Sequence, residues 1–280
     1  MTTLDEAAIR GFLDAANVTG IEDLAVFREI GSTNTYLRDG PPPARGSFRA
    51  ALADHQTAGR GRGGNRWVSA PGRSLCLSLA HTFATPPAGL PAFTLALGVS
   101  AVEVLAGFDA AGVGLKWPND LLVADAKLGG ILTETQHRPD GTAVVVAGLG
   151  LNVRLPLRLD DAPGPAFALR PVDLASLVDA PPSRERLAAA MLAGWCRAFA
   201  EFAAGGFAPF VERFNALDWL RGRSVTMAAG ERRVAGVAAG VDASGALLIE
   251  TGAGTVPVST GSVVAVKSIS GESISGESMT

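Results

Sequence analysis

Residues 54–67 read DHQTAGRGRGGNRW, and this glycine- and arginine-rich stretch decides how the rest of the chain is interpreted. Glycines let the backbone pass close to a ligand, and guanidinium groups present forked donors that fit carboxylate or phosphate oxygens. From residue 55 to residue 73 the chain carries four arginines and no acidic residue, although its net charge is −3. The stretch therefore predicts a loop that closes over one small anion, with a solvated basic loop as the competing interpretation.

The same loop matches a dinucleotide-binding pattern, but its context argues against that fold. Gly59, Gly61 and Gly64 satisfy GxGxxG, which requires a strand immediately before the pattern and a helix immediately after it. Here residues 67–72 read WVSAPG and a further strand is expected next, so we do not expect a dehydrogenase. The sequence has no GxxxxGK[ST] loop and no GxSxG elbow, and its three histidines lack metal-ligand spacing, so no protein-held metal is expected.

Composition excludes several classes of protein. Hydrophobic residues make up 48% of the 280 residues and charged residues 18%, so the chain can bury a core and is not disordered. A net charge of −3 argues against a general nucleic-acid binder. Residues 74–102 carry no formal charge, but prolines interrupt them, and the N-terminus does not read as a signal peptide. Because Cys76 and Cys196 are isolated, we expect a reduced, cytoplasmic protein that does not span a membrane.

Hydrophobic periodicity and turn residues predict an α+β chain in two parts. Strands are expected at 25–30, 48–54, 74–83, 127–136 and 142–153, a hairpin at 113–125 that turns at 118–120, and helices at 3–15, 33–38, 90–105, 183–202 and 207–217. Thr3 and Glu6 have the form of a capping box for the first helix. From Arg221 onward, short β-type segments alternate with glycine turns and predict a small β-barrel of about 45 residues. The tail carries ISGES twice in tandem, at 269–273 and 274–278, and is expected to be disordered.

Three clusters downstream of the loop combine polar groups or glycines with apolar strands. They are KWPND at 116–120, KLGGIL at 127–132 and GLGLNV at 148–153. Glycines inside a strand usually mark a bulge or a ligand that lies against the backbone. Turn chemistry and small-residue packing are the competing interpretations of these clusters. A fourth polar segment, STN at 32–34, lies upstream of the loop, and its competing interpretation is a plain helix cap.

Taken in chain order, these segments resemble the bacterial biotin–protein ligases. The resemblance covers STN, ADHQTAGRGRGGNRW, LKWPND, KLGGIL and GLGLNV. It implies a mixed or antiparallel sheet with flanking helices, of the type found in class II aminoacyl-tRNA synthetases, in a catalytic domain over residues 1–220. Residues 221–267 resemble the family's SH3-like C-terminal barrel, which leaves 268–280 as the tail. About 25 residues precede the first expected strand, too few for the winged helix-turn-helix of ligases that act as repressors, so nucleic-acid binding is not expected.

The resemblance implies that the chain activates biotin with ATP, releases pyrophosphate, and transfers biotin to a lysine of a biotin carboxyl carrier protein of acetyl-CoA carboxylase. Mg²⁺ would be bound mainly through the phosphates. The residues implied to bind biotin are Ser32, Thr33, Asn34, Gln56, Gly59, Arg60, Gly61, Arg62, Lys127, Gly130, Gly148 and Gly150. Those implied to bind ATP are Arg60, Arg62, Trp67, Lys116, Asn119, Lys127 and Asn152. The catalytic roles are assigned to Lys127, Arg62 and Asp120.

The residue types suit both steps of such a reaction. A carboxylate with a pKa of about 4 to 5 needs no base at pH 7, so the first step is limited by repulsion from the polyphosphate, which Lys127, Arg62 and Mg²⁺ would offset. An acceptor lysine with a pKa of about 10.4 must lose a proton before it attacks the mixed anhydride. Asp120 is the candidate that would orient or deprotonate that amine.

The loop departs from the family's pattern at two positions, and two alternative functions remain. Gly63 and Asn65 stand where the family's loop commonly carries arginines, which bears on retention of the adenylate, with Arg66 as partial compensation. A lipoate or octanoate ligase shares the expected fold but is disfavoured by the GRGR loop and by KWPND. A non-catalytic biotin-binding module is the alternative of a different class. Exposed edge strands leave a homodimer open, and the acceptor protein does not follow from the sequence.

Overall fold

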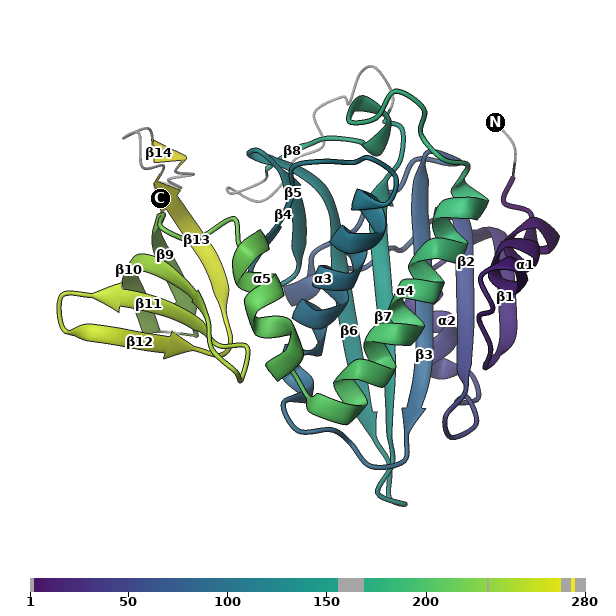
Figure 1. Ribbon diagram of the computed structural model, residues 1–280, viewed down its shortest axis with the longest axis horizontal. Helices are drawn as coiled ribbons and strands as arrows, with labels where there is room; N and C mark the ends of the chain where they lie inside the picture. Colours follow the sequence, from purple (N-terminus) through teal and green to yellow (C-terminus); the bar gives the residue numbers. More distant parts are fainter. Residues whose placement is uncertain (1–2, 156–168, 231, 268–272, 275–280) are drawn as a thin grey trace.

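The computed structural model describes residues 3–155, 169–230, 232–267 and 273–274. Its larger part is a mixed sheet with the strand order β1-β2-β3-β7-β6-β5-β4 (Figure 1). β1 and β2 run parallel, the other neighbours in this order are antiparallel, and β8 pairs in parallel with β6. The strands are β1 Ile21–Ile30, β2 Phe48–Gln56, β3 Ser74–Phe83, β4 Val113–Lys116, β5 Asp120–Val123, β6 Ala126–His137, β7 Ala143–Asn152 and β8 Arg170–Pro171.

Helices cover both faces of this sheet. The helices are α1 Glu6–Ala15, α2 Thr33–Asp39, α3 Phe93–Ala106, α4 Arg184–Gly205 and α5 Val211–Leu217. α3 and α4 lie across one face, with α1 beside α4, and α2 lies behind the sheet on the other (Figure 1). α4 is long and apolar enough to cross a membrane by length and composition alone, but 61% of that stretch is buried inside the protein. Its buried residues belong to the main hydrophobic core, so it is a core helix.

The sheet has one large-residue face and one small-residue face, because side chains alternate along each strand. On β3, Leu75, Leu77 and Leu79 are fully buried in the main core with α3 and α4. The intervening residues of β3 are small, and that second face packs against α2 in a separate small cluster around Leu37. This division leaves room between the sheet and the segments that cover its small-residue face.

The C-terminal part is an antiparallel sheet with the order β12-β11-β10-β9-β13-β14 (Figure 1). Its strands are β9 Ser224–Ala229, β10 Arg232–Val241, β11 Leu247–Thr251, β12 Gly254–Val258, β13 Ser262–Lys267 and β14 Ser273–Ile274. The Trp117 indole Nε1 donates to the Gly245 carbonyl at 3.1 Å, so this sheet is anchored on the turn after β4. Of the tail expected to be disordered, β14 pairs with β13, and the rest lies outside the described residues.

Several element boundaries differ from the expectations. The first helix is capped by Asp5 rather than Thr3, because the Leu4 amide is held by the Asp54 carboxylate at 3.2 Å, and the helix begins only after it. The strand expected at 25–30 begins at Ile21, where it already pairs with β2. The helices expected at 90–105 and 207–217 each begin with a 3₁₀ turn that contains a proline, Leu90–Ala92 and Ala208–Phe210.

Candidate active site

Two rows of small residues cross the middle of the sheet on the face that α2 covers. In the first row the paired positions are Ala53, Cys76, Gly150, Gly130 and Asp120. In the second they are Ala51, Ser78, Gly148 and Leu132. The glycines that the sequence singled out in two separate strands are therefore direct neighbours in one surface.

The glycines of β7 are required because other segments approach their backbone closely. A Cβ atom on Gly148 would overlap the Asn34 carboxamide, and one on Gly150 would overlap the Trp67 indole. Trp67 therefore lies over the middle of the first row. The sequence placed Trp67 on the nucleotide side of the site, and in the structure its ring contacts the row itself.

One end of this surface is a network of hydroxyl and amide groups, which we call the hydroxyl–amide end: Thr33, Asn34, Gln56 and Ser78. Gln56 Oε1 accepts from the Thr33 backbone amide at 2.8 Å and from Thr33 Oγ1 at 3.1 Å. Ser78 Oγ lies 2.7 Å from Thr33 Oγ1 and donates to Asn34 Oδ1 at 2.6 Å. All four side chains are buried. Their donors and acceptors are thereby fixed in direction, as recognition of a small polar ligand requires.

Ser32 has a structural role that the sequence also allowed. It is the N-cap of α2, and its hydroxyl accepts from the Thr35 amide at 3.4 Å. Because α2 starts here, the next two side chains point at the small-residue face. The helix-cap interpretation of the STN segment is therefore confirmed, and its other two residues, Thr33 and Asn34, lie in the hydroxyl–amide end, while their role toward biotin stays a prediction.

The glycine- and arginine-rich loop folds back on itself as a tight hairpin beside this network. The Gly61 amide donates to the Asn65 carbonyl at 2.7 Å, and the Trp67 amide donates to the Gly59 carbonyl at 3.0 Å. Gly63 at the tip has φ of +62°, a left-handed conformation that favours glycine. The glycine that departs from the family's arginine pattern is thus compatible with this hairpin where a larger residue would be strained.

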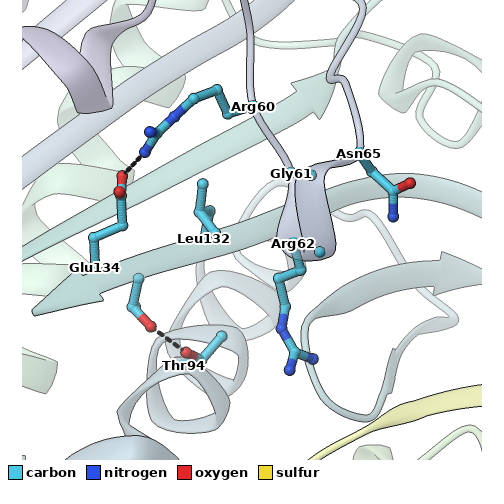
Figure 2. Close-up of a pocket in the computed structure, with 10 residues that line it drawn as sticks. Arg60, Gly61, Arg62, Asn65, Thr94, Leu132 and Glu134 are labelled. Carbon is cyan, nitrogen blue, oxygen red and sulfur yellow. Dashed lines mark hydrogen bonds and ion pairs between the residues drawn. The ribbon is translucent and has the colours of Figure 1, made fainter. Parts of the chain in front are cut away.

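A cavity of about 440 Å³ lies between this loop, α3 and β6 (Figure 2). It is lined by Arg60, Gly61, Arg62, Gly63, Gly64, Asn65, Thr94, Leu132, Thr133 and Glu134. Figure 2 shows the two arginines diverging: Arg60 reaches Glu134, and Arg62 points away from it. Burial lowers the pKa of Arg62, against the attraction of Asp120. The loop therefore directs one cation to each side of the cavity.

The other end of the surface is a charged cluster, which we call the lysine end: Lys116, Asp120 and Lys127. Lys127 Nζ lies 2.6 Å from Asp120 Oδ1, and Lys116 Nζ lies 3.6 Å from Asp120 Oδ2. Burial lowers the pKa of Lys116, which the charge of Asp120 opposes and that of Lys127 reinforces. Two cations held around one carboxylate leave a local excess of positive charge, which suits a polyanionic ligand.

The asparagines assigned to the nucleotide fix the backbone around this cluster. Asn119 Nδ2 donates to the Ile131 carbonyl at 3.0 Å, which joins the β4–β5 turn to β6. Asn152 Nδ2 donates to the carbonyls of Lys127 at 3.3 Å and Val172 at 3.1 Å. The amide oxygens of these side chains leave acceptor capacity beside the lysines, while their NH₂ groups hold the strands in place.

The structure adds residues that the sequence reasoning missed. Ser78 joins Thr33 to Asn34, Ser69 Oγ accepts from the Gln56 amide at 3.0 Å, and Glu134 contacts Arg60. Alternation along the strands carried a signal for Ser78 and Glu134, the two that lie in strands. Glu134, for example, lies four residues after Gly130 and so shares its face of the sheet. Nothing local marks Ser69, whose role depends on how the loop returns to β2.

Two family models and several known proteins match the chain. Residues 26–152 match the Biotin/lipoate A/B protein ligase family, and residues 221–265 match the Biotin protein ligase C terminal domain. The chain is 34% identical to the bifunctional ligase/repressor BirA of Salmonella typhimurium over 88% of this chain and 73% of that protein. It is 32% identical to a biotin–[acetyl-CoA-carboxylase] ligase of Mycobacterium tuberculosis, over 93% of this chain and 95% of the relative.

A solved structure of similar fold contains ligands. The biotin protein ligase of Aquifex aeolicus in complex with biotin and ATP superimposes with a TM-score of 0.72 and 25% identity, over 86% of this chain and 97% of that chain. The match covers most of both chains, so this chain shares its fold with a protein that holds biotin and ATP.

Proposed function

The chain belongs to the biotin protein ligase family, and from that premise we propose that it is an ATP-dependent biotin–[acetyl-CoA-carboxylase] ligase. The observation that carries the proposal is that the hydroxyl–amide end and the lysine end lie on one glycine-lined surface. The hydroxyl–amide end suits a neutral, polar ring system such as the ureido group of biotin. The lysine end suits a carboxylate and a phosphate brought together.

In the first step, a carboxylate oxygen of biotin attacks the α-phosphorus of ATP. The bond from that phosphorus to the oxygen bridging the β-phosphate breaks, and pyrophosphate leaves with the electron pair. Lys127 and Arg62 would offset the repulsion between carboxylate and phosphates and stabilise the charge that develops. Thr33, Asn34, Gln56 and Ser32 would hold the biotin ring, and Gly148 and Gly150 would let Asn34 and Trp67 lie close against the sheet beside it.

Mg²⁺ would enter with the nucleotide and reduce the charge of its phosphates. Among the described residues, no group of three or more His, Cys, Asp or Glu side chains could hold a metal ion by itself. That donor set fits a cation whose ligands are mainly phosphate oxygens. Lys116, Asn119 and Asn152 would then contact the nucleotide.

In the second step, the amine of an acceptor lysine attacks the acyl carbon of the biotinyl adenylate, and AMP leaves. The amine must lose a proton, since a lysine with a pKa of about 10.4 is almost fully charged at neutral pH. Asp120 would accept a hydrogen bond from that amine once Lys127 turns to the ligand. The acceptor would be a biotin carboxyl carrier protein in the cytoplasm, where Cys76 and Cys196 stay free thiols.

Transfer to a carrier domain tests the proposal. The chain is incubated with biotin, ATP, Mg²⁺ and a purified biotin carboxyl carrier domain, and the domain's mass is measured. The proposal predicts one added biotin on one lysine, and none when that lysine is replaced by arginine. No added mass with biotin would contradict it, and a thermal shift with lipoate but not biotin would favour the lipoate ligase instead.

A further inference from the structure

Glu134 is the acidic residue of the cavity wall, and it binds three groups from two other segments. Its carboxylate pairs with Arg60 of the loop and accepts from Asn34 Nδ2 at 3.1 Å and from Arg38 Nη1 at 3.2 Å. Burial opposes its ionisation, but the hydrogen bonds from Arg60, Asn34 and Arg38 outweigh that effect and lower its pKa. Glu134 therefore stays ionised at neutral pH in the centre of this arrangement.

The strand that carries Glu134 belongs to the main sheet. Glu134 pairs with Val146 of β7 in a continuous antiparallel register that also holds Gly130 against Gly150. α2 and the loop, in contrast, lie on top of the sheet; backbone hydrogen bonds hold the start of the loop at Thr57 and Ala58, and side-chain contacts join Arg60 and α2 to the sheet. The Glu134 carboxylate contacts both α2 and the loop, so it can fix the position of each relative to the sheet. A direct contact between α2 and the loop would not fix either of them to the sheet.

Arg60 is held at one end only. Its Nη2 pairs with Glu134, while its Nε is buried and has no hydrogen-bond partner within the described ranges. A buried donor without a partner carries a penalty of about 1–3 kcal/mol. Within the described ranges, the guanidinium is thus anchored through its contact with Glu134.

We propose that Glu134 is a positioning residue that fixes Arg60 and Asn34 for biotin, through its charge and without contacting the reacting atoms. This inference rests on the proposed function and adds to it a residue outside the assigned set. Arg62, on the far side of the loop tip, is not held by Glu134 (Figure 2). Loss of the Glu134 charge should therefore weaken biotin binding while leaving the chemical step nearly intact.

The test compares Glu134→Gln with wild type in biotin-dependent exchange of pyrophosphate into ATP. We expect the KM for biotin to rise about tenfold and kcat to change less than twofold, since a charge-assisted hydrogen bond is roughly twice as strong as a neutral one. Glu134→Gln made on top of Arg60→Ala should raise the KM further by clearly less than the tenfold seen in the wild-type background, because only Asn34 is then left for Glu134 to position. A purely structural role would instead lower the thermal midpoint and affect both backgrounds equally.

Glu103→Gln is the matched control, since Glu103 pairs with Arg213 at 2.7 Å on the exposed side of α3, and its KM should equal that of wild type. If Glu134→Gln does not fold, Glu134→Asp decides: the shorter carboxylate should give an intermediate KM, and a wild-type KM would overturn the inference. If the wild-type protein is active and Glu134→Gln has the wild-type KM for biotin, the inference about Glu134 is overturned and the proposed function stands. No biotin-dependent exchange in wild type would overturn the proposed function and this inference with it.

Discussion

The hydroxyl–amide end and the lysine end lie on the same small-residue face, yet they are built from different chemistry. At the first, buried neutral side chains are bonded to each other, as in the 2.6 Å contact between Ser78 and Asn34. At the second, ionised groups meet, as in the 2.6 Å contact between Lys127 and Asp120. The first can select a ligand by shape and hydrogen bonding, and the second can lower the barrier to joining two anions.

The two ends are also carried by different secondary-structure elements. The hydroxyl–amide end is held by α2 and by the central strands β2 and β3. The lysine end is carried by the short β4–β5 hairpin and the start of β6, and Trp117 at the hairpin turn donates to the Gly245 carbonyl of the C-terminal part. Substitutions at the first end should therefore change biotin affinity, and substitutions at the second should change the rate of adenylation.

Lys127→Ala is expected to have the largest effect. Removal of the cation that we propose lies between carboxylate and phosphate should slow single-turnover adenylation by about 100-fold or more. The fold should persist, because a third of the Lys127 side chain is exposed. Arg10→Ala, which breaks an exposed ion pair with Glu6 at 2.8 Å, is the control and should adenylate normally. Equal rates for Lys127→Ala and wild type would refute the division of roles between the two ends.

Gly150→Ala tests the row of small residues. Its methyl group would overlap the Trp67 ring, and β7 cannot withdraw because β3 and β6 pair with it on both sides. Overpacking of this kind costs about 1–3 kcal/mol, so we expect biotin affinity to fall about tenfold or more, measured by calorimetry. Gly252→Ala, at a position with open space around it, should bind biotin as wild type does. Normal affinity in Gly150→Ala would show that the ligand does not use this row.

Ser78→Ala should have a smaller effect at the hydroxyl–amide end. It removes the hydroxyl between Thr33 and Asn34 and leaves a buried amide oxygen without that donor, at about 1–3 kcal/mol. We expect the KM for biotin to rise about fivefold to tenfold with kcat unchanged. Ser100→Ala, at another buried serine on α3, serves as the control. A fall in kcat at constant KM would move Ser78 from selection to chemistry.

Asp218→Asn should leave activity unchanged and alter only stability. Burial raises the pKa of Asp218 to about 6, and its Oδ2 has no hydrogen-bond partner in the part of the chain that the structure describes. The folded state thus binds this proton more tightly than the unfolded state, so stability falls as pH rises from about 4 through 6. Asparagine removes that penalty, and we expect a thermal midpoint higher by about 3–6 °C at pH 7.5. At pH 5 the gain should shrink, and an equal gain at both pH values would contradict the assignment.

The sequence predicted most of the main sheet because its strands alternate and are separated by glycine and proline turns. It also selected the segments that meet at the site, since each carries a residue type that is unusual for its element, such as paired glycines in a strand. It missed Ser78 and Glu134, each a single polar residue in a strand, because their importance depends on which strands are neighbours. Strand order and register are set by long-range pairing, which local pattern does not contain. For the same reason the Asp54 contact that moves the first helix cap to Asp5 was not foreseen.

Biotin-dependent exchange of labelled pyrophosphate into ATP tests the central claim most directly, because it requires both ends of the surface to act on one substrate pair. We predict that exchange occurs with biotin and Mg²⁺, is absent without biotin, and is not supported by lipoate. Exchange that is absent with biotin, or that proceeds equally with lipoate, would contradict the account.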